Sequence, residues 1–167
     1  MNDESSEPLE AGKREMLRHT LATIAYRARK ILTGAPTGFS MFGVGETSRT
    51  PGQILAHICD LYDWANWLAR GEHKYAESQP AHWDADVARF FAALAKLDAY
   101  VASDAVLGRT PELIFQGPIA DSLTHLGQIA FLRRIAGAPV KGESYARAEI
   151  TVGRVGEDQA PAVWEFD

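Results

Sequence analysis

The chain has 167 residues, of which 46% are hydrophobic and 23% are charged, and a formal net charge of −5 at pH 7. These values predict one globular domain with a sizeable core. The acidic balance, with no basic cluster longer than Arg133-Arg134, argues against a nucleic-acid binder, and no apolar run reaches the ~20 residues of a membrane span. The single cysteine, Cys59, excludes an intramolecular disulfide and, with a polar acidic N-terminus, predicts a cytoplasmic protein.

The first third of the chain predicts a polar start, a long helix and a long connection. Residues 1–8 are acidic and predict a disordered lead-in. Apolar residues at spacings of three and four predict a helix over residues 9–32, ended by Gly34. Residues 34–50 are rich in glycine and form a connection too long for a simple turn. Its apolar side chains are expected to pack on the body, beside the mouth of a site: Phe39, Met41, Phe42 and Val44.

The middle of the chain predicts three more helices. Thr50-Pro51-Gly52-Gln53 is a helix start with a capping box, and this helix is expected to run to about Ala69. The third helix is expected from about Asp84 to Leu107. After a short turn or helix at residues 110–115, Gly117-Pro118 opens the last helix, which Gly137 closes.

These elements predict an all-α fold: a four-helix bundle over residues 9–140, with a long crossover loop. The C-terminal residues 141–167 are rich in glycine, proline and charge, with alternation only around residues 149–152. We expect them to pack on the bundle as an extended tail, with Trp164 and Phe166 as anchors. In such bundles, sites are built from side chains on facing helices.

Three side chains form a candidate metal site. Asp121 and His125 are four residues apart on the last helix, which places them on one face. His57 lies beside the core stripe of the second helix and points inwards. Three such ligands leave one coordination position open for water or a substrate, as in catalytic sites. The alternatives are a hydrogen-bonded histidine at the edge of the core, and an aspartate placed to interact with the helix dipole.

Several residues near these candidate ligands have two possible roles each. Asp60 either orients the His57 imidazole or is a solvated acid, and Gln128 either reaches the cavity or bonds within the bundle. Gly127 either clears space for the site or allows close helix packing. Cys59 lies about 200° round the helix from His57 and is expected in the core.

Two further pairs of residues have predicted roles outside the metal site: a tryptophan pair in packing or an interface, and an arginine pair at the end of the last helix. Trp64 and Trp67 are expected either to pack within the fold or to lie in an interface. Because these residues and the apolar connection of residues 34–50 would leave an apolar patch to cover, we expect a homodimer. Arg133 and Arg134 are assigned to the helix dipole.

Short motifs resemble the DinB/YfiT-like superfamily of metal-dependent proteins over about residues 10–140. They are the segment Thr50 to His57, the closing-helix segment Thr124-His125-Leu126-Gly127-Gln128, and Leu132-Arg133-Arg134 with Gly137. The resemblance implies a divalent metal (Zn, Ni or Fe) bound by one histidine of the second helix and an i, i+4 pair of the fourth. That pair is usually two histidines, and here its first member is Asp121.

The resemblance further implies a small-molecule substrate and a metal-dependent hydrolase, or a transferase that uses a low-molecular-weight thiol. The metal would lower the pKa of a water or thiol, and no residue can be named as the general base. The alternative is a non-catalytic, dimeric metal-binding or stress-associated protein.

Overall fold

A computed structural model describes residues 6–166 of the chain, without the side chains of residues 6 and 7. Helix α1 (Ser6–Leu32) begins three residues before the predicted start, so residues 6–8 belong to the helix and not to a lead-in. The rest of the predicted lead-in, residues 1–5, lies outside the described residues.

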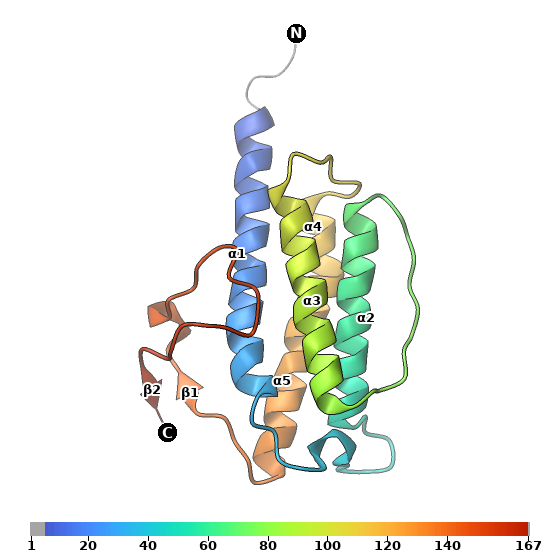
Figure 1. The fold of residues 1–167 in the computed structure, drawn as a ribbon, viewed down its shortest axis with the longest axis vertical. Helices are drawn as coiled ribbons and strands as arrows, with labels where there is room; N and C mark the ends of the chain where they lie inside the picture. The colour runs from blue at the N-terminus through green and yellow to red at the C-terminus, as the bar shows by residue number, and fades with distance from the viewer. Residues whose placement is uncertain (1–5, 167) are drawn as a thin grey trace.

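The fold is all-α. Four long helices, α1, α2 (Pro51–Ala69), α3 (Trp83–Ala102) and α5 (Ala120–Ile135), lie side by side along the long axis (Figure 1). Helix α2 packs on α3 and α5, and α1 packs on the same two helices. The shorter elements are 3-10 helices η1 (Phe39–Met41) and η3 (Tyr145–Arg147), helix α4 (Pro111–Ile114), π-helical segment η2 (Phe115–Ile119), and antiparallel strands β1 (Gly142–Glu143) and β2 (Glu165–Phe166).

One core lies between the long helices. It is built from the apolar stripes that the sequence predicts, and its largest fully buried side chains are Tyr62, Phe90, Leu21, Ile24, Leu32, Leu55, Ile58, Leu68, Leu94, Leu97, Ile114 and Ile119. Burial of these stripes supplies most of the stability of the helices, because in proteins the packing of an apolar face contributes more to helix stability than helix propensity does.

The start of α2 is as predicted. The Thr50 hydroxyl accepts from the Gln53 backbone N–H (3.3 Å), and the Gln53 side chain accepts from the Thr50 backbone N–H (2.9 Å). Before it, Phe39 is buried and its ring meets the Trp83 ring edge to face. The expectation for Met41 was wrong, since its side chain is 76% exposed.

Phe42 packs partly on the core, whereas Val44 is exposed and does not pack as predicted. The connection between α1 and α2 is therefore anchored through its two phenylalanines and not along its whole apolar stretch.

Helix α3 ends at Ala102, five residues before the predicted end at Leu107. The guanidinium of Arg14 on α1 donates to the carbonyl oxygens of Val101, Ser103 and Ala105. These bonds stabilise the end of the helix and the turn that follows, so the chain leaves the helix although apolar residues continue. Arg14 comes from 87 residues away in the sequence, which is why local periodicity misplaced the end.

The last helix also begins later than predicted. Gly117 has φ −86° and ψ −105°, outside the helical region, and a kinked segment precedes α5. A β-carbon on Gly117 would lie 3.6 Å from the Trp64 ring, so the kink packs directly beneath that side chain. At the other end, Gly137 adopts a left-handed φ of 76° after the helix, as the sequence predicts.

Arg133 has a larger role than the predicted dipole interaction. It is buried (6% exposed) and donates to the carbonyl oxygens of Ile31, Thr33 and Gly34 on the end of α1, and to that of Ala138. One side chain therefore satisfies carbonyls at the ends of two helices.

The C-terminal tail lies against α1 (Figure 1). The buried Glu143 carboxylate accepts from the Tyr26 hydroxyl (2.6 Å) and from Lys30 Nζ (3.1 Å). Trp164 and Phe166 are more than half exposed, so the expectation that they anchor the tail was wrong. The apolar contacts come instead from Val155 and Ala160, which are buried.

Candidate metal centre

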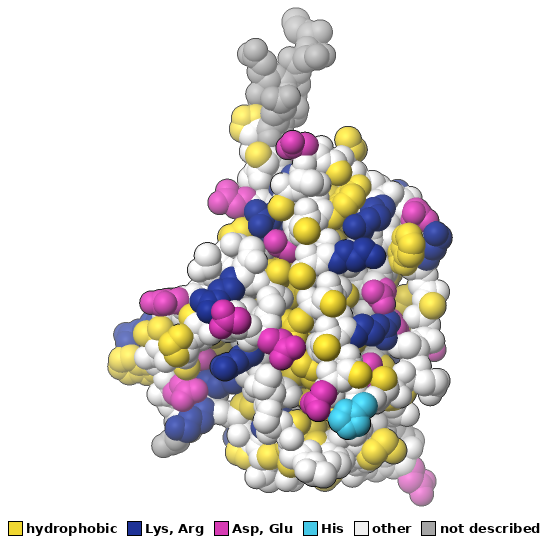
Figure 2. All heavy atoms as spheres, in the orientation of Figure 1, with side chains coloured by type: hydrophobic (Ala, Val, Ile, Leu, Met, Phe, Trp, Pro, Cys, Tyr) yellow, Lys and Arg dark blue, Asp and Glu magenta, His cyan; other side chains and the backbone are white. Residues whose placement is uncertain are grey.

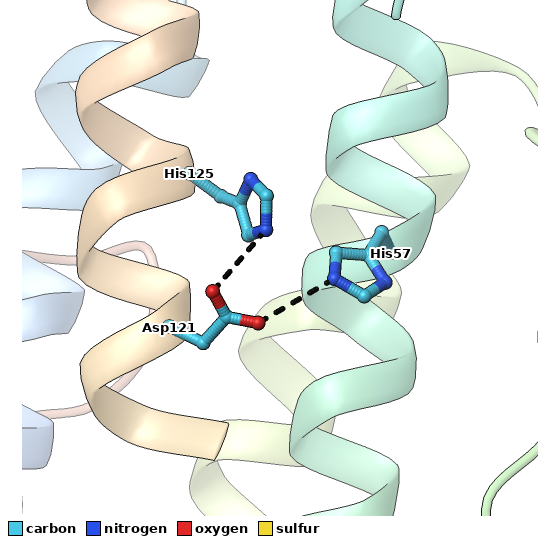
Figure 3. A group of neighbouring side chains, drawn as sticks. All are labelled: His57, Asp121 and His125. Carbon is cyan, nitrogen blue, oxygen red and sulfur yellow. Dashed lines mark ion pairs between the residues drawn. The ribbon is translucent and has the colours of Figure 1, made fainter. Parts of the chain in front are cut away.

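His57, Asp121 and His125 meet between α2 and α5. Figure 3 shows the Asp121 carboxylate between the two imidazoles, with one oxygen facing each ring. The His57 Nε2–Asp121 Oδ2 distance is 3.6 Å, and the His125 Nε2–Asp121 Oδ1 distance is 3.4 Å. The two rings are nearly perpendicular, with centroids 4.7 Å apart. The structure therefore brings together all three side chains that the sequence analysis proposed as metal ligands.

A buried hydrogen bond fixes the two helices next to this cluster. The Tyr62 and Ser122 hydroxyls are 2.8 Å apart, and the Ser122 hydroxyl also donates to the carbonyl oxygen of Ile119. Because that bond uses the only proton of the Ser122 hydroxyl, Tyr62 donates to Ser122. This pair joins α2 to α5 one residue from Asp121 and five from His57, and so sets the position along the helices at which the cluster forms.

Each imidazole has a hydrogen-bond partner at Nδ1, the ring nitrogen on the side away from Asp121. The Nδ1 of His125 lies 3.0 Å from Gln128 Oε1, and the Nδ1 of His57 lies 3.2 Å from the Tyr75 hydroxyl. An amide oxygen only accepts, so the His125 Nδ1 donates to Gln128, and the neutral imidazole with this tautomer has its lone pair on Nε2. When Tyr75 accepts in the same way, both Nε2 lone pairs face the cluster. Such partners are typical of histidines that bind metals.

The spacing of the donor atoms fits a small divalent metal. Bonds of about 2.0–2.2 Å in a tetrahedral arrangement separate neighbouring ligand atoms by about 3.4 Å. Each imidazole lies at about that distance from a different oxygen of Asp121, and one donor atom from each residue lies within 4.8 Å of the other two. A modest approach of the two imidazoles would complete the geometry. Two imidazoles and a carboxylate are a common donor set for zinc and non-haem iron.

The electrostatics of the cluster favour neutral imidazole at His57. Burial lowers the pKa of His57 below its ordinary value, and the neighbouring His125 and Arg49 act in the same direction. Asp121 opposes this shift without reversing it. A neutral imidazole offers a lone pair without losing a proton first, so metal binding at His57 meets little competition from protons at neutral pH.

The cluster is accessible from solvent. The histidine side chains are 20% and 14% exposed, whereas the Asp121 side chain is 48% exposed. A small pocket of about 160 Å³ adjoins His57 and is lined by Arg49, Gln53, His57, Asp60, Glu77, Ser78, Gln79 and Pro80. Solvent can therefore reach the open side of the cluster.

Two of the neighbouring residues differ from their predicted roles. Asp60 does not orient the His57 imidazole, because the hydrogen bonds of its carboxylate within residues 6–166 come from the backbone N–H and hydroxyl of Ser78 and from Arg89. Gly127 neither clears space for the site nor packs against a helix, because it is exposed and a β-carbon there would meet nothing within 4 Å. Gln128, by contrast, contacts the site through His125.

Asp60 instead holds the segment that carries Tyr75. This segment, residues 72–82, runs without helix or strand from α2 to α3, and we call it the strap. Tyr75 escaped the sequence analysis because it is 18 residues from His57 and lies in no periodic pattern. Cys59 lies in the core as predicted, and burial raises the pKa of its thiol to about 12.

Comparisons of the chain with protein-family models, with curated proteins and with solved structures find no match. Within residues 6–166, no helix is both long enough and apolar enough to cross a membrane. The case for the site therefore rests on the arrangement of its own residues.

Proposed function

We propose that the chain is a metal-dependent enzyme of the DinB/YfiT-like type. In this proposal its four long helices form a four-helix bundle, and His57, Asp121 and His125 bind one divalent metal: Zn, Ni or Fe. The observation that carries the proposal is the convergence of these three donors from two helices, with one donor atom of each within 4.8 Å of the others.

The surrounding contacts support this proposal. Both imidazoles have a partner at Nδ1, which leaves Nε2 directed at the cluster, and burial lowers the pKa of His57. Structural zinc sites are closed by four protein ligands, whereas this cluster offers three and is open on the side of Asp121. Three ligands and an accessible side are typical of a catalytic centre.

The proposed chemistry is hydrolysis of a small molecule, or transfer to or from a low-molecular-weight thiol. A bound divalent metal supplies Lewis acidity that lowers the pKa of water or of a thiol. The residues of this chain supply the rest: Gln128 and Tyr75 hold the imidazoles, and Arg49 places a positive charge beside the pocket at His57. We further propose that the protein is cytoplasmic and a homodimer.

A non-catalytic metal-binding or stress-associated protein is the second candidate. One observation favours it: the pocket beside His57 has about 160 Å³, below the roughly 300 Å³ at which small-molecule sites begin. In this case the metal would join α2 to α5 and stabilise the fold without turning over a substrate.

Elemental analysis of purified protein tests the proposal. Wild type prepared without chelators should hold about one divalent metal per chain, and the variants Asp121→Ala and His125→Ala should hold little. Wild type without stoichiometric metal, even after incubation with Zn, Ni and Fe(II), would remove the basis of the proposal. If metal is bound and its removal changes only the thermal stability, the non-catalytic function is the better conclusion.

A further inference from the structure

A second cavity lies on the other face of the strap, between α2, α3 and residues 74–78. It has about 590 Å³, within the range of small-molecule sites. None of its lining residues belongs to the proposed metal ligands. It is lined by Asp60, Asp63, Trp64, Asn66, Trp67, Arg70, Lys74, Tyr75, Ala76, Glu77, Ser78, Arg89 and Lys96.

The charges in this cavity are divided between its two ends. At the end where Asp60 holds the strap, Arg89 donates to the carboxylates of Asp60 and Asp63 and so balances one of their two negative charges. At the other end, Arg70 lies over the Tyr100 ring at 4.3 Å, and Lys96 is one helical turn before Tyr100 on α3.

This second end carries uncompensated positive charge. Within residues 6–166, neither Arg70 nor Lys96 forms an ion pair, and the hydrogen bonds of Arg70 go to uncharged acceptors of Asn66. Figure 2 shows Lys and Arg side chains on the face where α3 and the strap lie, with Asp and Glu side chains among them. In a chain of net charge −5, two cations without carboxylate partners at one end of a cavity favour an anionic group there.

Aromatic rings form the walls of the same cavity. Trp64, Trp67 and Tyr75 line it, and the Trp64 and Tyr75 rings meet edge to face at 6.0 Å. Trp64 Nε1 is buried and is the only such side-chain nitrogen or oxygen in the described residues without a hydrogen-bond partner.

We propose that this cavity binds a small aromatic acid. The aromatic group packs among Trp64, Trp67 and Tyr75, and its acid group lies between Arg70 and Lys96. Tyr75 also contacts His57, so a ligand here lies one side chain away from the cluster of His57, Asp121 and His125. The site does not require a metal, because all its contacts come from α2, α3 and the strap.

Isothermal titration calorimetry with 1-naphthoate tests this site on the full chain, with and without added zinc. Naphthoate should bind one to one in both conditions, and the uncharged 1-naphthylmethanol should bind far more weakly. Lys96→Ala and Arg70→Gln should each weaken naphthoate binding about fivefold, as expected for the loss of one charge that solvent reaches. Arg134→Ala, which removes an exposed cation on α5 outside the cavity, should bind as wild type does.

Three results would overturn the proposal. They are no heat from naphthoate up to about 1 mM, unchanged affinity in both Lys96→Ala and Arg70→Gln, or inorganic phosphate binding as tightly as naphthoate. Circular dichroism of each variant establishes that it is folded, and Lys96, being exposed on α3, is the variant least able to disturb the fold. Because binding is measured without metal as well, failure of the metal centre leaves this test intact.

Discussion

The Asp121→Asn substitution separates metal binding from folding. The Asp121 side chain is 48% exposed, and its carboxylate lies beside the two histidines. Exposed substitutions of this kind change the free energy of unfolding by no more than about 0.5 kcal/mol. The metal-free variant should therefore melt close to wild type, while the amide in place of the carboxylate removes the only anionic ligand.

The expected size of the effect follows from the site. Losing a partner that merely orients a ligand costs 10–100-fold in metal affinity, so losing a direct ligand should cost about 100-fold or more. At a zinc concentration 100 times the Kd, wild type gains about 2.7 kcal/mol of stability. For a chain of this size that raises Tm by roughly 5–11 °C. A 100-fold weaker variant at the same concentration gains only about 0.4 kcal/mol, or about 1 °C.

Thermal unfolding with chelator and with zinc measures both quantities on the same samples. Asp84→Asn is the matched control, because its carboxylate also lies beside a histidine (His82, 3.9 Å) but is 87% exposed and outside the cluster. The control should keep the full shift. If zinc raises the Tm of Asp121→Asn as much as that of wild type, Asp121 is not a metal ligand. If metal-free Asp121→Asn melts far below metal-free wild type, Asp121 also stabilises the fold without metal.

Three further outcomes are expected. Arg133→Ala should lower the free energy of unfolding by about 3 kcal/mol in urea titrations, because it leaves carbonyls at two helix ends without their donor, whereas the exposed neighbour Arg134→Ala should change little. Cys59 should resist thiol-specific reagents at about pH 8 until the chain unfolds, since burial raises its pKa to about 12, and rapid labelling of folded protein would contradict this. Burial lowers the pKa of His57 below 6.5, so as pH falls this histidine takes up a proton in the unfolded chain before it does so in the folded chain. With chelator present, the free energy of unfolding should therefore decrease as pH falls below about 6.5. The decrease should be smaller in His57→Gln, which lacks this group.

Much of the helical framework could be predicted because its signals are local. The capping box of Thr50 and Gln53 and the left-handed Gly137 depend on neighbours within a few residues, and both lie where the sequence places them. The end of α3 and the start of α5 were displaced, because contacts with distant segments decide them. Arg14 reaches across to the end of α3, and Gly117 bends the chain beneath Trp64.

The same distinction holds for the candidate metal centre. The sequence by itself determined the i, i+4 pair of Asp121 and His125, since helix geometry places such residues on one face. It also determined that His57 borders the core. Only the tertiary structure decided that Tyr75, from the strap, supports His57, and that Asp60 holds the strap instead. Helical period is a property of neighbouring residues, whereas the partner of a side chain depends on which segments pack together, and that packing belongs to the whole chain.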